Sequence, residues 1–331
     1  MKIVIVKLSA LGDILHSMVV LQYINEYIPD VKIDWVVEEC YKDLFISNPH
    51  VNKVHTVNFK KIKNKKSFAL LFHQLKRIRK FGTYDIVIDM QGLIKSGLVS
   101  FLIKSKLTCG FDKGSIREKI SALFYNKKFN FPYERNIIER NISIISFALG
   151  ININKNLINL KSPFLFPSNN TLFDCIDNIK KNILIIPGAS YESKRYPVEK
   201  YIEIVSKIDA NFITIWGNSE EKILVNKMKS ISSKVHICEK LSLDKLISLI
   251  SQVDLVIGSD SGPTHMAWAL NVPSITLYGP TPGNRNSFSS KINRVIESES
   301  NVNPLNINKN DYSIRDIKIS KIVLDSKELL S

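Results

Sequence analysis

Short apolar runs alternate along the first half of the chain with segments whose apolar side chains recur at helical intervals. The runs are rich in Val and Ile and short enough to be buried strands, whereas the longer periodic segments are typical of helices. Predicted strands are 2–8, 32–37, 54–57, 84–90 and 107–110, and predicted helices are 14–27, 68–81 and 94–103. Strands that alternate with helices indicate a parallel sheet covered on both faces.

The same pattern restarts in the second half, after a stretch with two prolines at 161–170 that we interpret as a linker. We therefore predict an α/β fold of two doubly wound Rossmann-like domains facing a cleft, at 1–160 and 171–312. Residues 313–331 predict a C-terminal helix, weakened in its second half by Asp325 and Ser326. Packing back on the first domain is one arrangement open to this helix. The predicted strands here are 182–186, 211–216, 235–238, 254–257 and 274–278. The predicted helices are 196–208, a helix opened by the turn 217–221 that ends at 229, and 242–251.

Polar and glycine-containing turns follow the predicted strands, at the edge of a parallel sheet where ligands bind. The most informative turn, 258–265, joins a buried strand to a helix. Ser261 or Gly262 is a suitable N-cap there, and Pro263 suits the first helical turn. The N-terminus of a helix binds phosphate, and the Asp260 carboxylate stands beside it. A phosphate site with an adjacent carboxylate suggests a sugar nucleotide as the ligand.

The net charge of +15 is distributed unevenly. Residues 51–80 contain ten Lys and Arg and no Asp or Glu. This excess indicates an anionic partner, or alternatively a solvated basic face. Nucleic acid is disfavoured as the partner, because no helix-turn-helix, zinc-finger or RNP-type pattern is present.

The four cysteines lie far apart in the sequence and form no CxxC pair. We interpret them as reduced structural thiols of a cytoplasmic protein. No apolar run approaches the roughly 18 residues of a membrane-spanning helix. The N-terminal apolar run is interrupted by Lys7, so no signal peptide is predicted either.

The informative motifs are KLSALGDILHS (7–17), DWVVEE (34–39), YDIVIDMQGLIKS (84–96), ALFYNKK (122–128), the turn 187–197, SDSGPTH (259–265) and LYGPT (277–281). Together they resemble the glycosyltransferases that attach heptose to the inner core of lipopolysaccharide, which are family 9 enzymes of the GT-B fold. The resemblance implies transfer of L-glycero-D-manno-heptose from ADP-heptose, with inversion, to the Kdo sugar of Kdo-lipid A. A later inner-core heptosyltransferase and a non-catalytic basic protein that binds nucleotide sugars or membrane surfaces are the alternatives.

The resemblance assigns catalytic roles to Asp13 and Lys194. Asp13 would be the general base that takes the proton from the attacking Kdo hydroxyl. Read from the residue alone, the same carboxylate can simply stabilise a helix N-terminus. Lys194 would neutralise the diphosphate leaving group, although a lone lysine is more often a solvated side chain.

The resemblance also implies a donor-binding set in the second domain. Asp260 would bind sugar hydroxyls, with helix capping as an equal alternative, and His265 would contact the diphosphate or be a structural histidine. Ala189 departs from close relatives, which carry a hydroxyl there. The remaining assignments are Ser190, Ser261, Gly262 and Thr264 at the phosphates, Glu221 at the ribose, and Leu241 with Ser242 at the adenine.

For the acceptor, basic side chains suit the Kdo carboxylate and the lipid A phosphates. Phe68, Leu70, Leu71 and Phe72 are interpreted as core residues rather than a membrane-inserting surface. No metal and no cofactor beyond the donor substrate are expected, since no DxD motif follows a strand. A peripheral location on the anionic cytoplasmic face of the inner membrane follows from this acceptor. The acceptor candidates are Lys60, Lys61, Lys63, Gln91, Lys95 and Arg117.

Overall fold

The computed structural model describes residues 1–169 and 171–331 and divides into two compact units, Met1–Phe164 and Leu165–Ser331. The division falls inside the predicted linker. Within the described ranges, no helix combines the length and the apolar character needed to span a bilayer.

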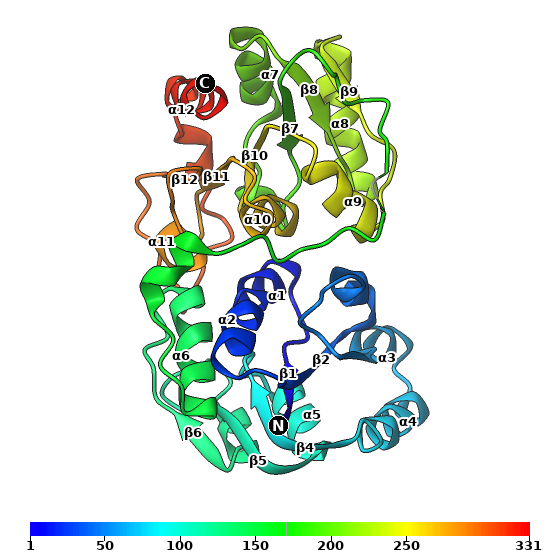
Figure 1. Ribbon diagram of the computed structural model, residues 1–331. Coiled ribbons are helices and arrows are strands. Elements are labelled where there is room, and N and C mark those ends of the chain that lie inside the picture. Colours follow the sequence, from blue (N-terminus) through cyan, green and yellow to red (C-terminus); the bar gives the residue numbers. More distant parts are fainter. Residues whose placement is uncertain (170) are drawn as a thin grey trace. The chain divides into compact units, whose positions relative to one another are not determined.

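The first unit is built on a six-stranded parallel sheet in the order β3-β2-β1-β4-β5-β6 (Figure 1). Its central strand β1 is buried on both faces, which explains its unbroken apolar run. The strands are β1 (Lys2–Val6), β2 (Lys32–Glu38), β3 (Lys53–Val57), β4 (Thr83–Asp89), β5 (Lys104–Phe111) and β6 (Lys127–Phe129). The helices are α1 (Leu11–Met18), α2 (Val20–Tyr27), α3 (Phe59–Lys65), α4 (Phe68–Ile78), α5 (Ile94–Leu102) and α6 (Ile137–Leu149), with 3₁₀ turns at Glu39–Phe45, Lys119–Phe124 and Lys155–Leu160.

The second unit repeats this topology, with the strand order β12-β11-β10-β7-β8-β9. When strands are counted within each unit, the first strand of each sheet lies beside the fourth, as β1 lies beside β4 and β7 beside β10. This is the doubly wound strand order, and ligands bind at the point where the order reverses. The strands are β7 (Asn182–Ile186), β8 (Asn211–Thr214), β9 (Val235–Ile237), β10 (Leu255–Ser259), β11 (Ser274–Tyr278) and β12 (Asn293–Glu297). The helices are α7 (Val198–Lys207), α8 (Ser219–Ile231), α9 (Leu243–Ile250), α10 (Gly262–Ala269), α11 (Gly283–Asn286) and α12 (Ile319–Leu330), with 3₁₀ turns at Glu192–Lys194 and Ser313–Asp316.

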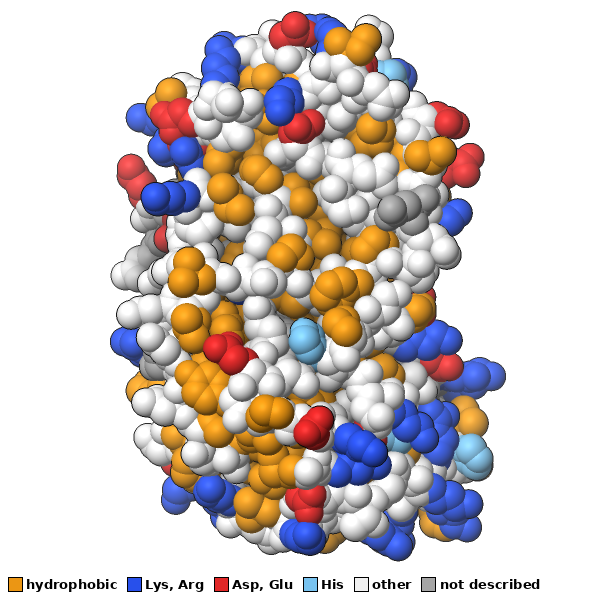
Figure 2. All heavy atoms as spheres, in the orientation of Figure 1, with side chains coloured by type: hydrophobic (Ala, Val, Ile, Leu, Met, Phe, Trp, Pro, Cys, Tyr) orange, Lys and Arg blue, Asp and Glu red, His pale blue; other side chains and the backbone are white. Residues whose placement is uncertain are grey.

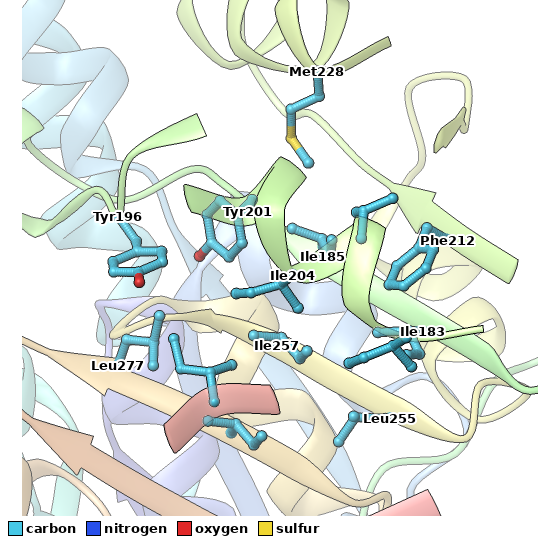
Figure 3. Packing of buried hydrophobic residues seen from close by; sticks show 14 of the residues in the cluster. Ile183, Ile185, Tyr196, Tyr201, Ile204, Phe212, Met228, Leu255, Ile257 and Leu277 are labelled. Carbon is cyan, nitrogen blue, oxygen red and sulfur yellow. The ribbon is translucent and has the colours of Figure 1, made fainter. Parts of the chain in front are cut away.

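The core of the second unit lies between its sheet and helices α7 and α12. Figure 3 shows Tyr201 and Ile204 of α7 packed in one cluster with Ile183, Ile185 and Ile257 of the sheet. The strand side chains are fully buried, because β7 and β10 are central strands with neighbours on both sides. This packing holds the carboxyl ends of β7 and β10 side by side.

The C-terminal helix α12 packs on α7, β10 and β11 of its own unit. Asp325 does not weaken it, because the buried Asp325 carboxylate accepts from Arg294 at 2.6 Å and from Lys321 at 2.9 Å. The predicted helix 14–27 is instead two helices that meet at Val19. The helices and strands that the sequence analysis missed are α3, α6, α11, β6 and β12.

Candidate functional site

The turn after β10 presents the open N-terminus of α10 at the edge of the second sheet. Ser261 occupies the N-cap position, and the first intrahelical bond runs from His265 N to Ser261 O. The N–H groups of Gly262 and Thr264 precede that bond and point out of the helix end. The Thr264 hydroxyl donates to Ser259 O at 2.8 Å and lies 3.0 Å from Ser261 Oγ. The predicted phosphate-binding turn therefore has the backbone that this role requires.

Asp260 is a buried carboxylate with three side-chain partners, rather than the helix cap that was the alternative. It accepts from Lys194 Nζ at 2.6 Å and from Thr281 Oγ1 at 2.9 Å, and His265 Nε2 lies 2.9 Å from its other oxygen. Burial by itself raises the pKa of Asp260, but the Lys194 charge and the hydrogen bond with His265 outweigh burial and hold the pKa well below its usual range. The cluster therefore keeps a carboxylate and an ammonium side by side.

Two further side chains belong to this cluster although the sequence analysis did not single them out. Thr281 is buried, and its only signal was its place at the end of the LYGPT motif. The Tyr191 ring lies 5.5 Å from Lys194 Nζ. Burial and the Asp260 charge raise the pKa of Tyr191 to about 12, so this phenol is neutral at physiological pH.

Glu221 reaches back from the first turn of α8 to the carboxyl ends of β7 and β8. Its carboxylate accepts from Gly217 N at 2.7 Å. A Cβ added to Gly188 would stand 2.5 Å from the Glu221 carboxyl carbon, so any other residue there would displace this carboxylate. The Glu221 side chain thus lies against the turn after β7, at Gly188, and against the turn after β8, at Gly217.

The remaining donor candidates are less closely connected. Ser190 is exposed, one residue past the buried Ala189. Ser242 is the N-cap of α9, where its hydroxyl accepts from Lys245 N at 3.3 Å, and Leu241 is half-buried beside it. Trp216, which the sequence analysis missed, follows β8 and has Lys222 Nζ 4.7 Å from its ring centroid.

In the first unit, the turn after β1 is held by side chains from the turn after β4. The exposed Asp13 carboxylate accepts from Ala10 N at 3.2 Å. Gln91 Oε1 accepts from Leu8 N at 2.7 Å, and Lys95 Nζ donates to Ser9 Oγ at 2.9 Å. Gln91 and Lys95, predicted to contact the acceptor, therefore position the segment that carries Asp13.

A cavity of about 430 Å³ lies between the end of β2 and helix α3. Burial raises the pKa of Glu38, while the charges of Lys95 and Lys60 and the N–H groups at the start of α3 oppose this shift. Glu38, which the sequence analysis missed, is thus a lining residue of the cavity whose pKa responds to the charges of Lys60 and Lys95. The lining residues are Glu38, Glu39, Cys40, Asn58, Lys60, Lys61, Asn64 and Lys65, so the candidates Lys63 and Arg117 are not among them.

Helix α4 exposes two aromatic side chains, contrary to the prediction that they belong to the core. Phe68 is 86% exposed and Phe72 is 61% exposed, and Lys76 Nζ lies 4.4 Å from the Phe72 ring centroid. Figure 2 shows Lys and Arg side chains gathered over the part of the first unit that carries α3 and α4. Among residues 1–169 and 171–331, no group of three His, Cys, Asp or Glu is placed to bind a metal.

Comparison with known proteins identifies the class of this chain. A model of glycosyltransferase family 9 (heptosyltransferase) matches residues 71–310. A lipopolysaccharide heptosyltransferase 1 from Campylobacter coli is 35% identical over 345 aligned residues, covering 99% of both chains. The heptosyltransferase 1 of Escherichia coli K12 is 27% identical and covers 86% of this chain and 89% of that one. The chain belongs to glycosyltransferase family 9, which confirms the predicted family and enzyme class.

Solved structures agree with the fold. The E. coli heptosyltransferase WaaC with ADP superposes with a TM-score of 0.81 at 23% identity, covering 99% of this chain and 100% of that chain. The E. coli ADP-heptose lps heptosyltransferase II gives a TM-score of 0.72 at 20% identity, covering 100% and 98%. The predicted pair of doubly wound domains of the GT-B class is confirmed.

Proposed function

We propose that this chain is an inverting glycosyltransferase that moves L-glycero-D-manno-heptose from ADP-heptose to the Kdo sugar of Kdo-lipid A. The observation that carries the proposal is the full-length match, at 35% identity, to a lipopolysaccharide heptosyltransferase 1. The residue roles given next are part of the proposal and are supported by the local geometry of each unit.

On the donor side, the diphosphate would bind at the α10 N-terminus, against the N–H groups of Gly262 and Thr264. Lys194 would neutralise the charge that develops on the leaving ADP, because a positioned cation stabilises such charge without any rearrangement of solvent. Asp260 would hold Lys194 in place through their 2.6 Å ion pair and offer an oxygen to the sugar hydroxyls. His265 and Ser261 complete this group, while Ser190, Glu221 and Leu241 would contact the phosphate, ribose and adenine.

On the acceptor side, Asp13 would act as the general base. Its exposed carboxylate can meet an entering hydroxyl, and its segment is braced by Gln91 and Lys95. As the hydroxyl oxygen attacks the anomeric carbon opposite the leaving ADP, Asp13 takes its proton, and the configuration inverts. A positioned base of this kind is worth roughly 10²–10⁴-fold in rate.

The acceptor would be held by basic side chains of the first unit. Lys60 and Lys61 line the cavity beside Glu38, and Lys63 and Arg117 would reach the outer phosphates. Phe68 and Phe72, four residues apart on α4, would enter the interface of the anionic inner membrane, since exposed rings beside lysines favour such surfaces. Exposure of both rings supports a peripheral location on the cytoplasmic face of that membrane.

The test is to incubate the purified chain with ADP-heptose and Kdo-lipid A and to measure the mass of the lipid product. Addition of one heptose, lost when ADP-heptose is omitted, is the expected result. Transfer only to an acceptor that already carries a heptose would replace the proposal with a later inner-core heptosyltransferase. Binding of ADP-heptose without any transfer would indicate a non-catalytic binding protein.

A further inference from the structure

Two cysteines that lie far apart in the sequence meet in the second unit. Cys175 precedes β7 and Cys238 follows β9, and their Sγ atoms are 2.9 Å apart although 63 positions separate them. Both are free thiols; Cys175 is half-buried and Cys238 is buried. A disulfide bond measures about 2.05 Å, so a shift of less than about 1 Å would join the two sulfurs.

The backbone on each side of the pair is anchored to the same strand. Asn211, the first residue of β8, donates from Nδ2 to Cys175 O at 2.7 Å. Cys238 N donates to the carbonyl of Thr214, the last residue of β8, at 2.9 Å. Strand β8 therefore holds both segments, that of Cys175 at its first residue and that of Cys238 at its last, and so positions the backbone from which both thiols extend.

We propose that Cys175 and Cys238 form a reversible thiol–disulfide site whose co-reactant is a small disulfide such as oxidised glutathione. This site is independent of the proposed transferase chemistry, because neither thiol belongs to the donor or acceptor group. It replaces the interpretation of these two residues as separate structural thiols.

The reaction proceeds in two exchanges. Cys175, as the thiolate, attacks one sulfur of the small disulfide; its S–S bond breaks, one small thiolate leaves and takes up a proton, and a mixed disulfide forms on Cys175. Cys238 then loses its proton to solvent and attacks the Cys175 sulfur, which expels the second small thiol. The two cysteines lose two electrons together, and the small disulfide gains them.

The two thiols are unequal in a way that sets this order. Cys175 is the more accessible one, and attack requires access as well as the thiolate form. The hydrogen bond from Cys238 lowers the pKa of Cys175, whereas the hydrogen bond with Cys175, followed by burial, raises the pKa of Cys238. Cys175 is therefore the attacking thiol, and Cys238 is the resolving one.

The test uses the full-length protein, reduced, freed of reductant and incubated with oxidised glutathione at neutral pH. Acid quenching, blocking with N-ethylmaleimide and tryptic digestion without reductant follow. Cleavage after Lys161, Lys180, Lys234 and Lys240 places the two cysteines in peptides 162–180 and 235–240. In most molecules we expect these peptides joined, two hydrogens lighter than their sum, and separated again by dithiothreitol.

Three variants control the result. Cys40→Ala removes an exposed cysteine outside the pair and should leave the joined peptide unchanged. Cys175→Ala should abolish it, and Cys238→Ala should accumulate glutathione on Cys175 because the resolving thiol is gone. Recovery of the two wild-type peptides separately, or joined to Cys40 or Cys109 instead, would overturn the proposal. An unmodified Cys175 in Cys238→Ala would overturn its role as the attacking thiol.

Discussion

Asp260 shows how a single residue depends on partners from distant segments. Its partners Lys194 and Thr281 lie 66 and 21 positions away, while His265 lies one helical turn on. Lys194 and Asp260 are both almost fully buried, so each charge depends on the other to offset the cost of leaving water. Substitution of either residue should consequently affect the stability of the fold as well as the proposed donor chemistry.

Asp260→Asn is expected to lower the free energy of unfolding by about 3–5 kcal/mol, because it leaves the buried Lys194 ammonium unpaired. Urea unfolding followed by circular dichroism measures the change. Asp209→Asn is the matched control, since it breaks an ion pair with Lys180 that is exposed on both sides. Equal loss in the two variants would contradict the importance of the buried pair.

The same residue predicts a pH dependence. The folded-state pKa of Asp260 is below its unfolded value, so its contribution to stability is fully present above about pH 4, the ordinary range of an Asp carboxyl. As the pH falls below that value, the contribution declines until the folded carboxylate is protonated. The difference in unfolding free energy between wild type and Asp260→Asn should therefore shrink as the pH falls below about 4.

Asp13→Asn tests the general base. The carboxylate is exposed and accepts one local hydrogen bond at 3.2 Å, so the fold should be unaffected. We expect the rate of heptose transfer to fall by about 10²–10⁴-fold with ADP-heptose binding unchanged. Initial rates and calorimetric titration measure the two quantities, and a rate near wild type would refute the assignment.

At the scale of elements, α3 and α4 turn a basic stretch of sequence into two different surfaces. Asn58 caps α3 by accepting from Lys61 N at 3.0 Å, and Ser67 caps α4 by accepting from Leu70 N at 3.3 Å. These caps separate a cavity-lining helix from a helix that exposes Phe68 and Phe72. Substitutions in α3 and in α4 should therefore cause different defects, the first in acceptor binding and the second in membrane binding.

Replacing Lys60, Lys61 and Lys63 together with Ala should raise the KM for Kdo-lipid A several-fold and leave the KM for ADP-heptose unchanged. The reason is the loss of charge opposite the acceptor's anionic groups. Steady-state kinetics with each substrate varied in turn makes the measurement. Ala at Lys207, Lys234 and Lys245, exposed in the second unit, is the matched control. If only the KM for ADP-heptose changed, these three lysines would be assigned to donor binding instead.

The double variant Phe68→Ser, Phe72→Ser should bind vesicles containing phosphatidylglycerol roughly tenfold or more weakly, as measured by co-sedimentation. The reason is that burial of each ring contributes about 1.5–3 kcal/mol. Since both rings are exposed, the unfolding midpoint should hardly change. Ile223→Ser, on an exposed apolar side chain of α8, is the control. Unaltered sedimentation of the double variant would remove α4 from the membrane-binding surface.

At the scale of the whole molecule, each unit repeats one strand order and places its polar turns at the same kind of edge. In the first unit the turns after β1 and β4 are joined by Gln91, and in the second the turns after β7 and β8 are joined by Glu221. Each pair comes from neighbouring strands of its sheet. The topology therefore explains why residues of separate motifs meet within each unit.

Most strands and helices, the two repeated halves and the polar turns were predictable from the sequence, because apolar periodicity, glycine turns and capping are local properties. Only the tertiary structure decided the Lys194–Asp260 pair, the cavity lined by Glu38 and Lys60, the exposure of Phe68 and Phe72, and the meeting of Cys175 with Cys238. It also decided that α12 packs on its own unit. These features depend on which distant segments the sheets bring together, and the spacing of residues along the chain does not specify which segments those are.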